Sequence, residues 1–408
     1  MNYFFSHILI AFLAALTSTF AFADNGCDKS YALQVEVSGL IGANLCDSSS
    51  SSFVDSLKSW ERTNLNYTQT SQAYALGRFN DVTVTLNYAA NSTTLVYNFP
   101  ELGHAGSFTG STRDKSQQLF IDYLKKGGII GQIMNYQSQH SPTSPISGAG
   151  GLVPMTIAGD FNTNFSNSTT AVAGPGGGST DNLIGVQASY TSFSVDKTSD
   201  RVKVTSIPLS YTIRNNIDPR RQLIFSLPVT LLEVGASKTV QAGLGISYRV
   251  PLSDQWTLTP GAGFSGVGSV DRATLTSLYS ASLTSTFIIP FSDFDISIGD
   301  LIGYYATGKF SAGDYSFNPD LKYTATRNGI MLSQPVNLLG NKLGVEYSLI
   351  DTRYLGNEKP YIDNFQEYSI TLGTNKSALD ARSFFRAGLT YTHGPGVNGF
   401  KANLGYWF

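Results

Sequence analysis

From Leu183 to Phe408 the sequence alternates between apolar and small or polar side chains, in segments of about ten residues separated by turns. In the segment VQAGLGISYRV, the apolar residues Val240, Leu244 and Tyr248 share one face, whereas Gln, Gly, Ser and Arg occupy the other. The same pattern runs through IPLSYTIR, LIFSLPVTL, EYSITLG, FRAGLTYT and FKANLGYWF. A period of two residues predicts β-strands with one apolar face.

The composition of the polar face separates a barrel from a soluble sandwich. A sandwich strand also alternates, but its outer face meets water and carries Lys and Glu. Here that face is Gly, Ser, Thr, Gln and an occasional Arg, which suits a narrow, wet interior. Aromatic residues stand near the ends of the apolar face, where a bilayer interface would lie: Tyr211, Tyr248, Trp256, Tyr391 and Tyr406. Because strands cross lipid only as closed barrels, we predict a transmembrane antiparallel β-barrel over residues 183–408.

The turns predict the number of strands. Eleven breaks fall near 197–201, 215–220, 235–238, 252–255, 270–273, 292–293, 309–320, 338–342, 355–364, 375–382 and 393–399. They predict about 12 strands, an even number, with both barrel termini in the periplasm. Pro208, Pro228 and Pro260 fit poorly because each removes a ladder donor. The alternation slips around Asp300, which predicts a β-bulge there.

Composition agrees with a lipid-facing surface. Only 14% of the residues are charged, roughly half the share usual in a soluble protein. The formal net charge of -2 argues against a nucleic-acid partner.

Residues 1–23 are predicted to be a signal peptide, because residues 8–23 are almost wholly apolar and end in Ala21-Phe22-Ala23. The alternative, an uncleaved membrane helix, would be short for a span.

The region between the signal and the barrel has two parts. The sequence of residues 24–145 indicates a small α+β domain. It contains a short helix at FVDSLKSW, a hairpin over 81–99 and a helix over 111–128 whose apolar stripe includes Leu119. Residues 146–182 are rich in Gly, Ser, Pro, Thr and Asn and predict either a flexible linker or a plug ordered by its surroundings. Cys27 and Cys46 are the only cysteines, and an exported chain favours a disulfide over free thiols.

By these features the chain resembles a Gram-negative outer-membrane β-barrel, most sharply in its last residues, NLGYWF. The resemblance implies that outer-membrane lipid and the barrel-assembly machinery are partners, and that Leu404, Tyr406 and Phe408 are the assembly signal. Twelve strands after a Gly/Ser-rich segment are also similar to an autotransporter translocator. The short, compact region before the barrel departs from that pattern, because it shows no repetitive β-helical passenger.

Inward charged and polar side chains are the candidate functional residues of the lumen. We expect Arg214, Arg249, Glu346, Glu367, Arg386, Lys401 and Asn403 to face it. They would either tune ion selectivity or form a paired network that closes the pore.

We expect no catalytic, cofactor or metal site. His393 in the last outer loop is the sole histidine of the barrel region and has no evident catalytic partner. The acidic group Asp351, Glu358, Asp363 and Glu367 matches no calcium loop and is interpreted as solvated.

The sequence thus predicts an outer-membrane pore or export conduit, with the N-terminal domain in the periplasm or in the lumen. The domain or the linker would gate it, and an exported protein or a small solute would be the cargo. The alternative is a non-conducting barrel that anchors the N-terminal domain for adhesion or envelope assembly, and an enzyme ranks last.

Overall fold

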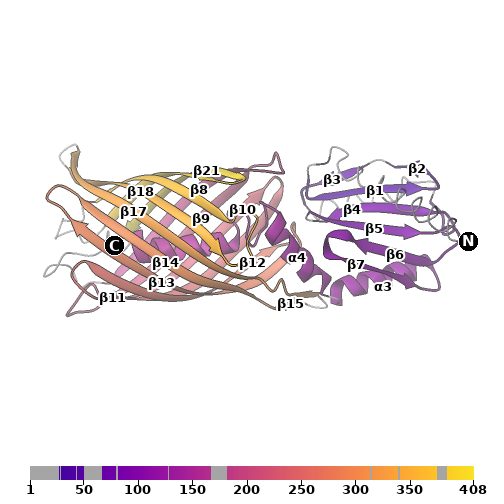
Figure 1. Ribbon diagram of the computed structural model, residues 1–408, viewed down its shortest axis with the longest axis horizontal. Coiled ribbons are helices and arrows are strands. Elements are labelled where there is room, and N and C mark those ends of the chain that lie inside the picture. Colours follow the sequence, from indigo (N-terminus) through magenta and orange to yellow (C-terminus); the bar gives the residue numbers. More distant parts are fainter. Residues whose placement is uncertain are drawn as a thin grey trace, which may run out of the picture. The chain divides into compact units, whose positions relative to one another are not determined.

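The computed structural model describes residues 27, 29–42, 44–49, 67–79, 81–126, 128–166, 182–312, 315–338, 341–374 and 384–408 (Figure 1). The chain divides into two compact units, Met1–Ile121 and Asp122–Phe408. The predicted signal peptide, the FVDSLKSW helix and the glycine run at 176–178 lie outside the described residues.

The first unit is an antiparallel sheet of seven strands. Its order is β2-β1-β4-β5-β6-β7, and β3 also pairs with β1. The strands are β1 (Tyr31–Val37), β2 (Leu40–Ile41), β3 (Leu45–Asp47), β4 (Ala73–Phe79), β5 (Val82–Tyr88), β6 (Thr94–Phe99) and β7 (His104–Thr109). A 3-10 turn, η2 (Pro100–Leu102), joins β6 to β7. The predicted hairpin is β5–β6, and Asn91 in its turn adopts the left-handed conformation at φ 57°.

Helix α3 (Arg113–Lys126) follows the sheet. Phe120 packs against the Tyr97 ring at a centroid distance of 5.2 Å. The expected apolar stripe comprises Leu119, Phe120, Tyr123 and Leu124; Phe120 is buried against the aromatic residues of β6 and β7 as predicted, but Leu119 is 44% exposed, so the stripe is wrong at that residue. Cys27 and Cys46 are joined by a disulfide, with their Cα atoms 5.9 Å apart.

The second unit contains a closed antiparallel barrel of twelve strands, as the turn pattern predicted. They are β8 (Leu183–Val195), β9 (Val202–Arg214), β10 (Gln222–Val234), β11 (Ser237–Pro251), β12 (Trp256–Ser269), β13 (Thr274–Pro290), β14 (Asp295–Gly308), β17 (Lys322–Leu338), β18 (Asn341–Leu355), β19 (Asn364–Thr374), β20 (Phe384–Gly394) and β21 (Val397–Trp407). Each strand pairs with its neighbour in the sequence, and β21 pairs with β8 to close the barrel. The closure leaves no free strand edge, which a chain in lipid requires.

The barrel has two rims. The terminal rim holds Leu183 and Trp407, together with the connections 215–221, 252–255 and 291–294. The distal rim holds the connections 196–201, 235–236, 270–273, 309–321, 356–363 and 395–396. The longest of these carries the short hairpin β15 (Phe310–Ala312) and β16 (Tyr315–Phe317).

The strand register is regular where the sequence suggested irregularity. Pro208 and Pro228 are opposite each other on β9 and β10, and the ladder continues in the same register on both sides of them. The expected bulge at Asp300 is wrong, because β14 pairs without interruption from Asp295 to Gly308. The alternation slips there because Asp300 itself occupies an outward position.

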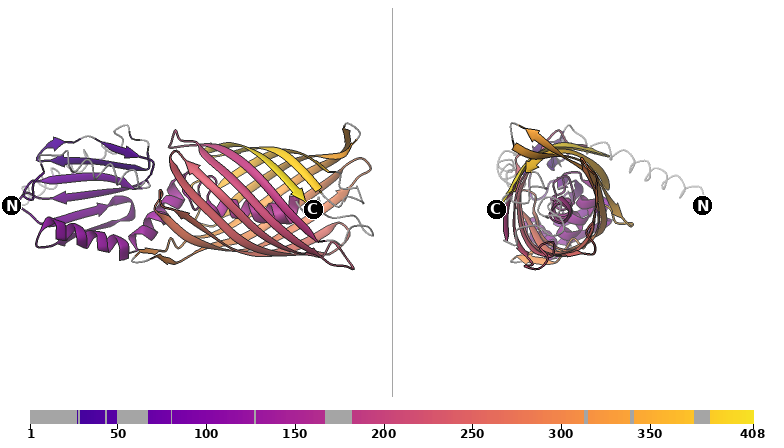
Figure 2. Two further views of the ribbon diagram at one scale, coloured as in Figure 1. Left: turned by 180° about the vertical axis from the view of Figure 1, so that it is seen from behind. Right: turned by 90° about the vertical axis from the view of Figure 1, so that its left-hand side faces the viewer.

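A helical segment enters the barrel, and Figure 2 shows helix inside the wall in the view along the barrel axis. Its α5 (Leu152–Phe161) and the π-helical turn η3 (Asn162–Ser166) contact barrel strands, whereas α4 (Ile129–His140) contacts β16 at the distal rim. We call residues 129–166 the plug. Residues 122–145 therefore group with the barrel rather than with the sheet, because their apolar side chains pack on the inner wall. No described helix is long and apolar enough to cross a membrane.

Candidate functional site

The lumen is closed near the distal rim by residues 141–153 of the plug, which we call the seal. Every residue of the seal is buried. On one side Ile146, Leu152 and Val153 pack with apolar wall residues of β12, β13, β14, β17 and β18. On the other side Ala149 packs with Val195, Val202, Val204, Leu232, Val234, Ile362 and Val397. The interior of a transmembrane barrel is normally polar, so an apolar inner ring is unusual. Here the seal covers the apolar ring and keeps it from water.

The seal has a compact backbone fold of its own. The amide of Gly148 donates to Ser144 O at 2.9 Å, that of Ala149 to Pro142 O at 2.8 Å and that of Val153 to Ile146 O at 2.8 Å. Residues 146–166 are therefore an ordered plug rather than a flexible linker. Composition alone could not separate the two, because Ser, Gly and Pro occur in both.

Polar contacts fasten the plug to the wall and to the distal rim. Arg272, in the connection between β12 and β13, donates to Thr143 Oγ1 at 3.0 Å. Gln241 of β11 donates to Gly150 O at 3.0 Å. At the rim, Asn135 of α4 donates to Pro319 O at 2.7 Å, and Lys197 donates to His140 O at 2.7 Å. The seal and α4 are thus held from several sides of the barrel.

The plug continues toward the terminal rim along one wall. Phe161 and Phe165 pack with Leu301, Met331 and Ile350. Tyr305 donates to the Asp160 carboxylate at 3.3 Å, and Asn164 donates to Thr284 Oγ1 at 3.2 Å. Arg249 donates to Thr163 O at 3.3 Å. The far end of the plug therefore lies beside Arg249, two residues from the end of β11 at the terminal rim, and beside Thr284 in the terminal half of β13.

All seven residues expected to face the lumen lie on the inner side of the wall. Arg386 forms an ion pair with Glu346, and Arg327 with Glu367. Lys401 lies 3.9 Å from the Glu367 carboxylate. Arg249 donates to Gln222 Oε1 at 2.5 Å, and Arg214 lies beside Gln222 on the neighbouring strand. Asn403 lines the remaining space. These pairs tie β17, β18, β19, β20 and β21 together from the inside.

Arg327 and Arg272 were not among the residues predicted to face the lumen. Arg327 is 1% exposed and faces inward from β17. The inner and outer faces of β17 are both mixed, so its period of two is weak. Arg272 lies in a connection, where polar residues are expected and do not attract notice. The pairing of Arg327 with Glu367 could be found only from the register of β17, β18 and β19.

A cavity of about 260 Å³ remains between the plug and the wall. Small and hydroxyl residues of β8 to β12 line one side, among them Ser206, Gly243 and Ser265. The ion-paired residues of β17 to β21 line the other. The cavity extends from Ala149 and Gly150 of the seal to Gly405 and Trp407 near the terminal rim.

The outer face of the barrel carries the predicted assembly signal. Leu404, Tyr406 and Phe408 are 51%, 45% and 53% exposed. Trp407 points inward, and a β-carbon on Gly185 would lie 2.5 Å from its Nε1 atom. The aromatic residues expected at the interfaces, from Tyr211 to Tyr406, also lie on the outer face.

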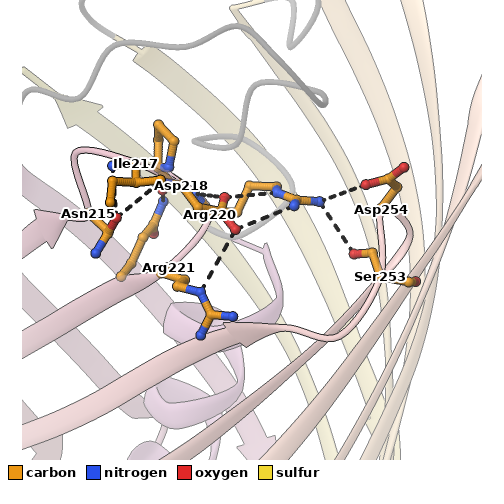
Figure 3. Close-up of polar contacts among 9 residues, drawn as sticks. Asn215, Ile217, Asp218, Arg220, Arg221, Ser253 and Asp254 are labelled. Atoms are coloured by element: carbon orange, nitrogen blue, oxygen red, sulfur yellow. Dashed lines mark hydrogen bonds and ion pairs between the residues drawn. The ribbon is translucent and has the colours of Figure 1, made fainter.

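A charged cluster at the terminal rim joins two connections, as Figure 3 shows. Arg220 donates to Asp218 Oδ1 at 3.0 Å and to Asp254 Oδ1 at 3.2 Å. Burial raises the pKa of the Asp218 carboxyl, but the hydrogen bonds and charge of Arg220 and the charge of Arg221 outweigh it, so the pKa falls below its ordinary value. The cluster fixes the 215–221 turn against the 252–255 turn.

The remaining candidates are His393 and the acidic group, whose interpretation as solvated is wrong for Glu367, because that residue is buried. His393 is exposed and shares a hydrogen bond of 2.7 Å with Asn398. Asp351 lies on the outer face of β18 and accepts hydrogen bonds from Arg353 and Gln366, whereas Glu367 points into the lumen. Within the described ranges, no three His, Cys, Asp or Glu residues are grouped to hold a metal ion.

No family model and no curated protein matches the chain. Among solved structures, the beta domain of the Bordetella autotransporter BrkA is similar at 13% identity and a TM-score of 0.45, over 56% of this chain and 98% of that one. The translocator domain of autotransporter NalP from Neisseria meningitidis is similar at 12% identity and 0.44, over 63% and 95%. An outer-membrane channel from Pseudomonas putida F1 is similar at 10% identity and 0.38, over 58% and 98%. By its own closed sheet and apolar outer face, the chain folds as a transmembrane β-barrel whose lumen is occupied by its own residues 141–166.

Proposed function

We propose that the barrel exports its own N-terminal unit through the lumen and then holds that unit at the cell surface, with the plug left behind as a seal. The observation that carries this proposal is the path of the plug from one rim to the other. Toward its C-terminal end, Thr163 accepts a hydrogen bond from Arg249, two residues from the end of β11 at the terminal rim, and Asn164 contacts Thr284 in the terminal half of β13. Toward its N-terminal end, Asn135 and His140 contact connections of the distal rim.

The orientation of the barrel gives this path a direction across the membrane. Outer-membrane barrels have short periplasmic turns and longer external loops. Here the longest connection, 309–321, is on the distal rim, and both barrel termini are on the terminal rim. We therefore assign the terminal rim to the periplasm. A chain that passes the lumen toward the distal rim emerges outside, so the N-terminal unit belongs at the surface rather than in the periplasm or the lumen.

The seal supports a conduit that works during assembly rather than a permanently open pore. A small solute would have to pass residues 141–153, which are buried against apolar wall residues on both sides. Displacing them would expose apolar surface of the wall to water, and this exposure is unfavourable. The finished protein is then a non-conducting anchor for the unit that it exported, available for adhesion at the surface.

Cysteine labelling in intact cells tests the proposal. Lys115→Cys places a thiol at an exposed position of α3. Val270→Cys marks the distal rim and Ile217→Cys the terminal rim, at side chains that are 83% and 95% exposed. A membrane-impermeant maleimide should label positions 115 and 270 in intact cells, and position 217 only after the outer membrane is permeabilised. Labelling of position 270 but not 115 would overturn surface display, and labelling of 217 alone would show that the barrel has the opposite orientation.

A further inference from the structure

Asp300 places a carboxylate on the lipid-facing side of the barrel. It occupies an outward position of β14 and is exposed. Its neighbours on the same face are Ile298 and Ile302, and Ile302 is 52% exposed. Across to β13, the apolar pairs Phe287–Ile298 and Leu283–Ile302 enclose Asp300 on both sides along the strands. Asp300 is therefore inside the apolar band, where an ionisable side chain is costly and usually has a function.

Asn328 lies beside Asp300 at the next outward position around the barrel. The two residues are Cα partners in the pairing of β14 with β17. Asn328 is also exposed, and Ile330, the next residue on its face, is 47% exposed. Along the strands, the two polar side chains are flanked by Ile298, Ile302 and Ile330, and around the barrel by the polar residues Ser285 and Asp351.

The other polar side chains in this row already have partners. Ser285, opposite Asp300 on β13, accepts a hydrogen bond from Trp256 Nε1 at 3.0 Å. Asp351, opposite Asn328 on β18, accepts hydrogen bonds of 2.7 Å from Gln366 and Arg353. Within the part of the chain that the structure describes, the side chains of Asp300 and Asn328 make no hydrogen bond or ion pair. The centre of the row thus offers one acceptor group and one amide donor to lipid.

We propose that the Asp300–Asn328 patch is the centre of an interface with a second copy of this chain. A two-fold axis parallel to the membrane normal keeps each residue at the same depth in both copies. If the axis passes between the two residues, each Asp300 meets the partner's Asn328 and each Asn328 meets the partner's Asp300. The amide then donates to the carboxylate twice, and the surrounding Ile298, Ile302 and Ile330 pack around the two hydrogen bonds. Polar side chains bridge membrane segments in this way because lipid offers them no other partner.

Site-directed crosslinking tests the proposed geometry. Two differently tagged chains, one with Asp300→Cys and one with Asn328→Cys, are co-expressed and oxidised in membranes. The proposal expects a mixed disulfide dimer. A control pair, Leu209→Cys with Leu227→Cys, uses Cα partners of β9 and β10 on the opposite wall, both exposed and apolar. It should give no mixed dimer. Crosslinks that are absent at 300/328, or equal at both walls, would refute the interface.

Sedimentation of the full chain in density-matched detergent provides a second measurement. The wild type should have twice the mass of one chain. Asp300→Leu and Asn328→Leu should each raise the dissociation constant of the dimer about tenfold or more and so shift the population to monomer. Asp300→Asn, which keeps an acceptor, should remain dimeric. Gln334→Leu, at another exposed outward position of β17, is the matched control and should not change the mass. A compact band on unboiled gels shows that each variant is folded. A monomeric wild type, or a dimeric Asp300→Leu, would overturn the proposal.

Discussion

Gly150 of the seal lies so close to Val204 of β9 that a β-carbon on it would stand 2.3 Å from Val204 Cγ2. Its φ of +70° is also in the left-handed region, which other residues adopt only with strain. Both features follow from the fit of the seal against the wall. The closure of the lumen therefore depends on the absence of a side chain at this position.

Gly150→Ala should loosen the seal without unfolding the barrel. Strain of about 1–3 kcal/mol would favour local opening. Hydrogen exchange measured by mass spectrometry should become about tenfold faster at amides bonded inside the seal, such as those of Gly148 and Val153. Gly159→Ala is the control, because a β-carbon there meets nothing within 4 Å. Equal exchange rates in the two variants would show that the seal does not depend on this contact.

Glu367→Gln should destabilise the barrel from inside. The change leaves Arg327 and Lys401 without their carboxylate, and Arg327 is 1% exposed. Removing one partner of a buried pair costs about 3–5 kcal/mol. The compact band on unboiled gels should be lost at a lower temperature than in the wild type. Glu358→Gln, at an exposed position of the 356–363 connection, should behave like the wild type; a similar loss in both variants would contradict a structural role for the pair.

The first unit should be sensitive to alkaline pH through Tyr88. Its hydroxyl donates to Arg113 O at 3.0 Å, and burial, with smaller effects of nearby charges, raises its pKa to about 12. Because the pKa is higher in the folded state, the stabilisation is complete below the unfolded value of 10.0 and is lost as pH rises toward 12. Limited proteolysis of the full chain should show the sheet opening in this window. Tyr88→Phe should weaken this pH dependence, and an unchanged profile would exclude Tyr88 as the titrating group.

In the last strand, outward Phe408 and inward Trp407 should have different roles, Phe408 in assembly and Trp407 in packing. Removing Phe408, whose ring is exposed on the outer face, should lower the amount of barrel in the outer membrane, while the inserted fraction stays heat-resistant. Trp407→Ala should reduce insertion less, because Trp407 is 6% exposed and packs inside the barrel. Fractionated membranes and unboiled gels measure both effects. A larger insertion defect for Trp407→Ala would show that the inner face of the strand is what the assembly machinery reads.

Local patterns were sufficient to predict the barrel, because the alternation within each strand determines which side chains face lipid and which face the lumen. Val240, Leu244 and Tyr248 all lie outward as the period of two requires. The turns then supply the strand number without any long-range information. The predicted bulge at Asp300 was wrong, because an outward carboxylate interrupts the apolar face in the sequence without interrupting the strand pairing.

The plug could not be predicted with the same certainty, because its order comes from contacts distant in sequence. Ser144 and Gly148 form a local turn. Gly150, however, packs against Val204 and accepts a hydrogen bond from Gln241, and Thr143 accepts one from Arg272. A Ser-, Gly- and Pro-rich segment carries no sign of these partners. The direction in which the plug crosses the lumen likewise depends on contacts such as Asn135 with Pro319.

Conductance in planar bilayers, compared between the full chain and a variant that lacks residues 24–166, tests the sealed conduit most directly. The full chain should be silent, because residues 141–153 fill the lumen against apolar residues around the wall. The shortened variant, which keeps all twelve strands, should insert and conduct steadily. A full chain that conducts steadily would contradict the seal, and a folded, inserted variant that stays silent would contradict the conduit.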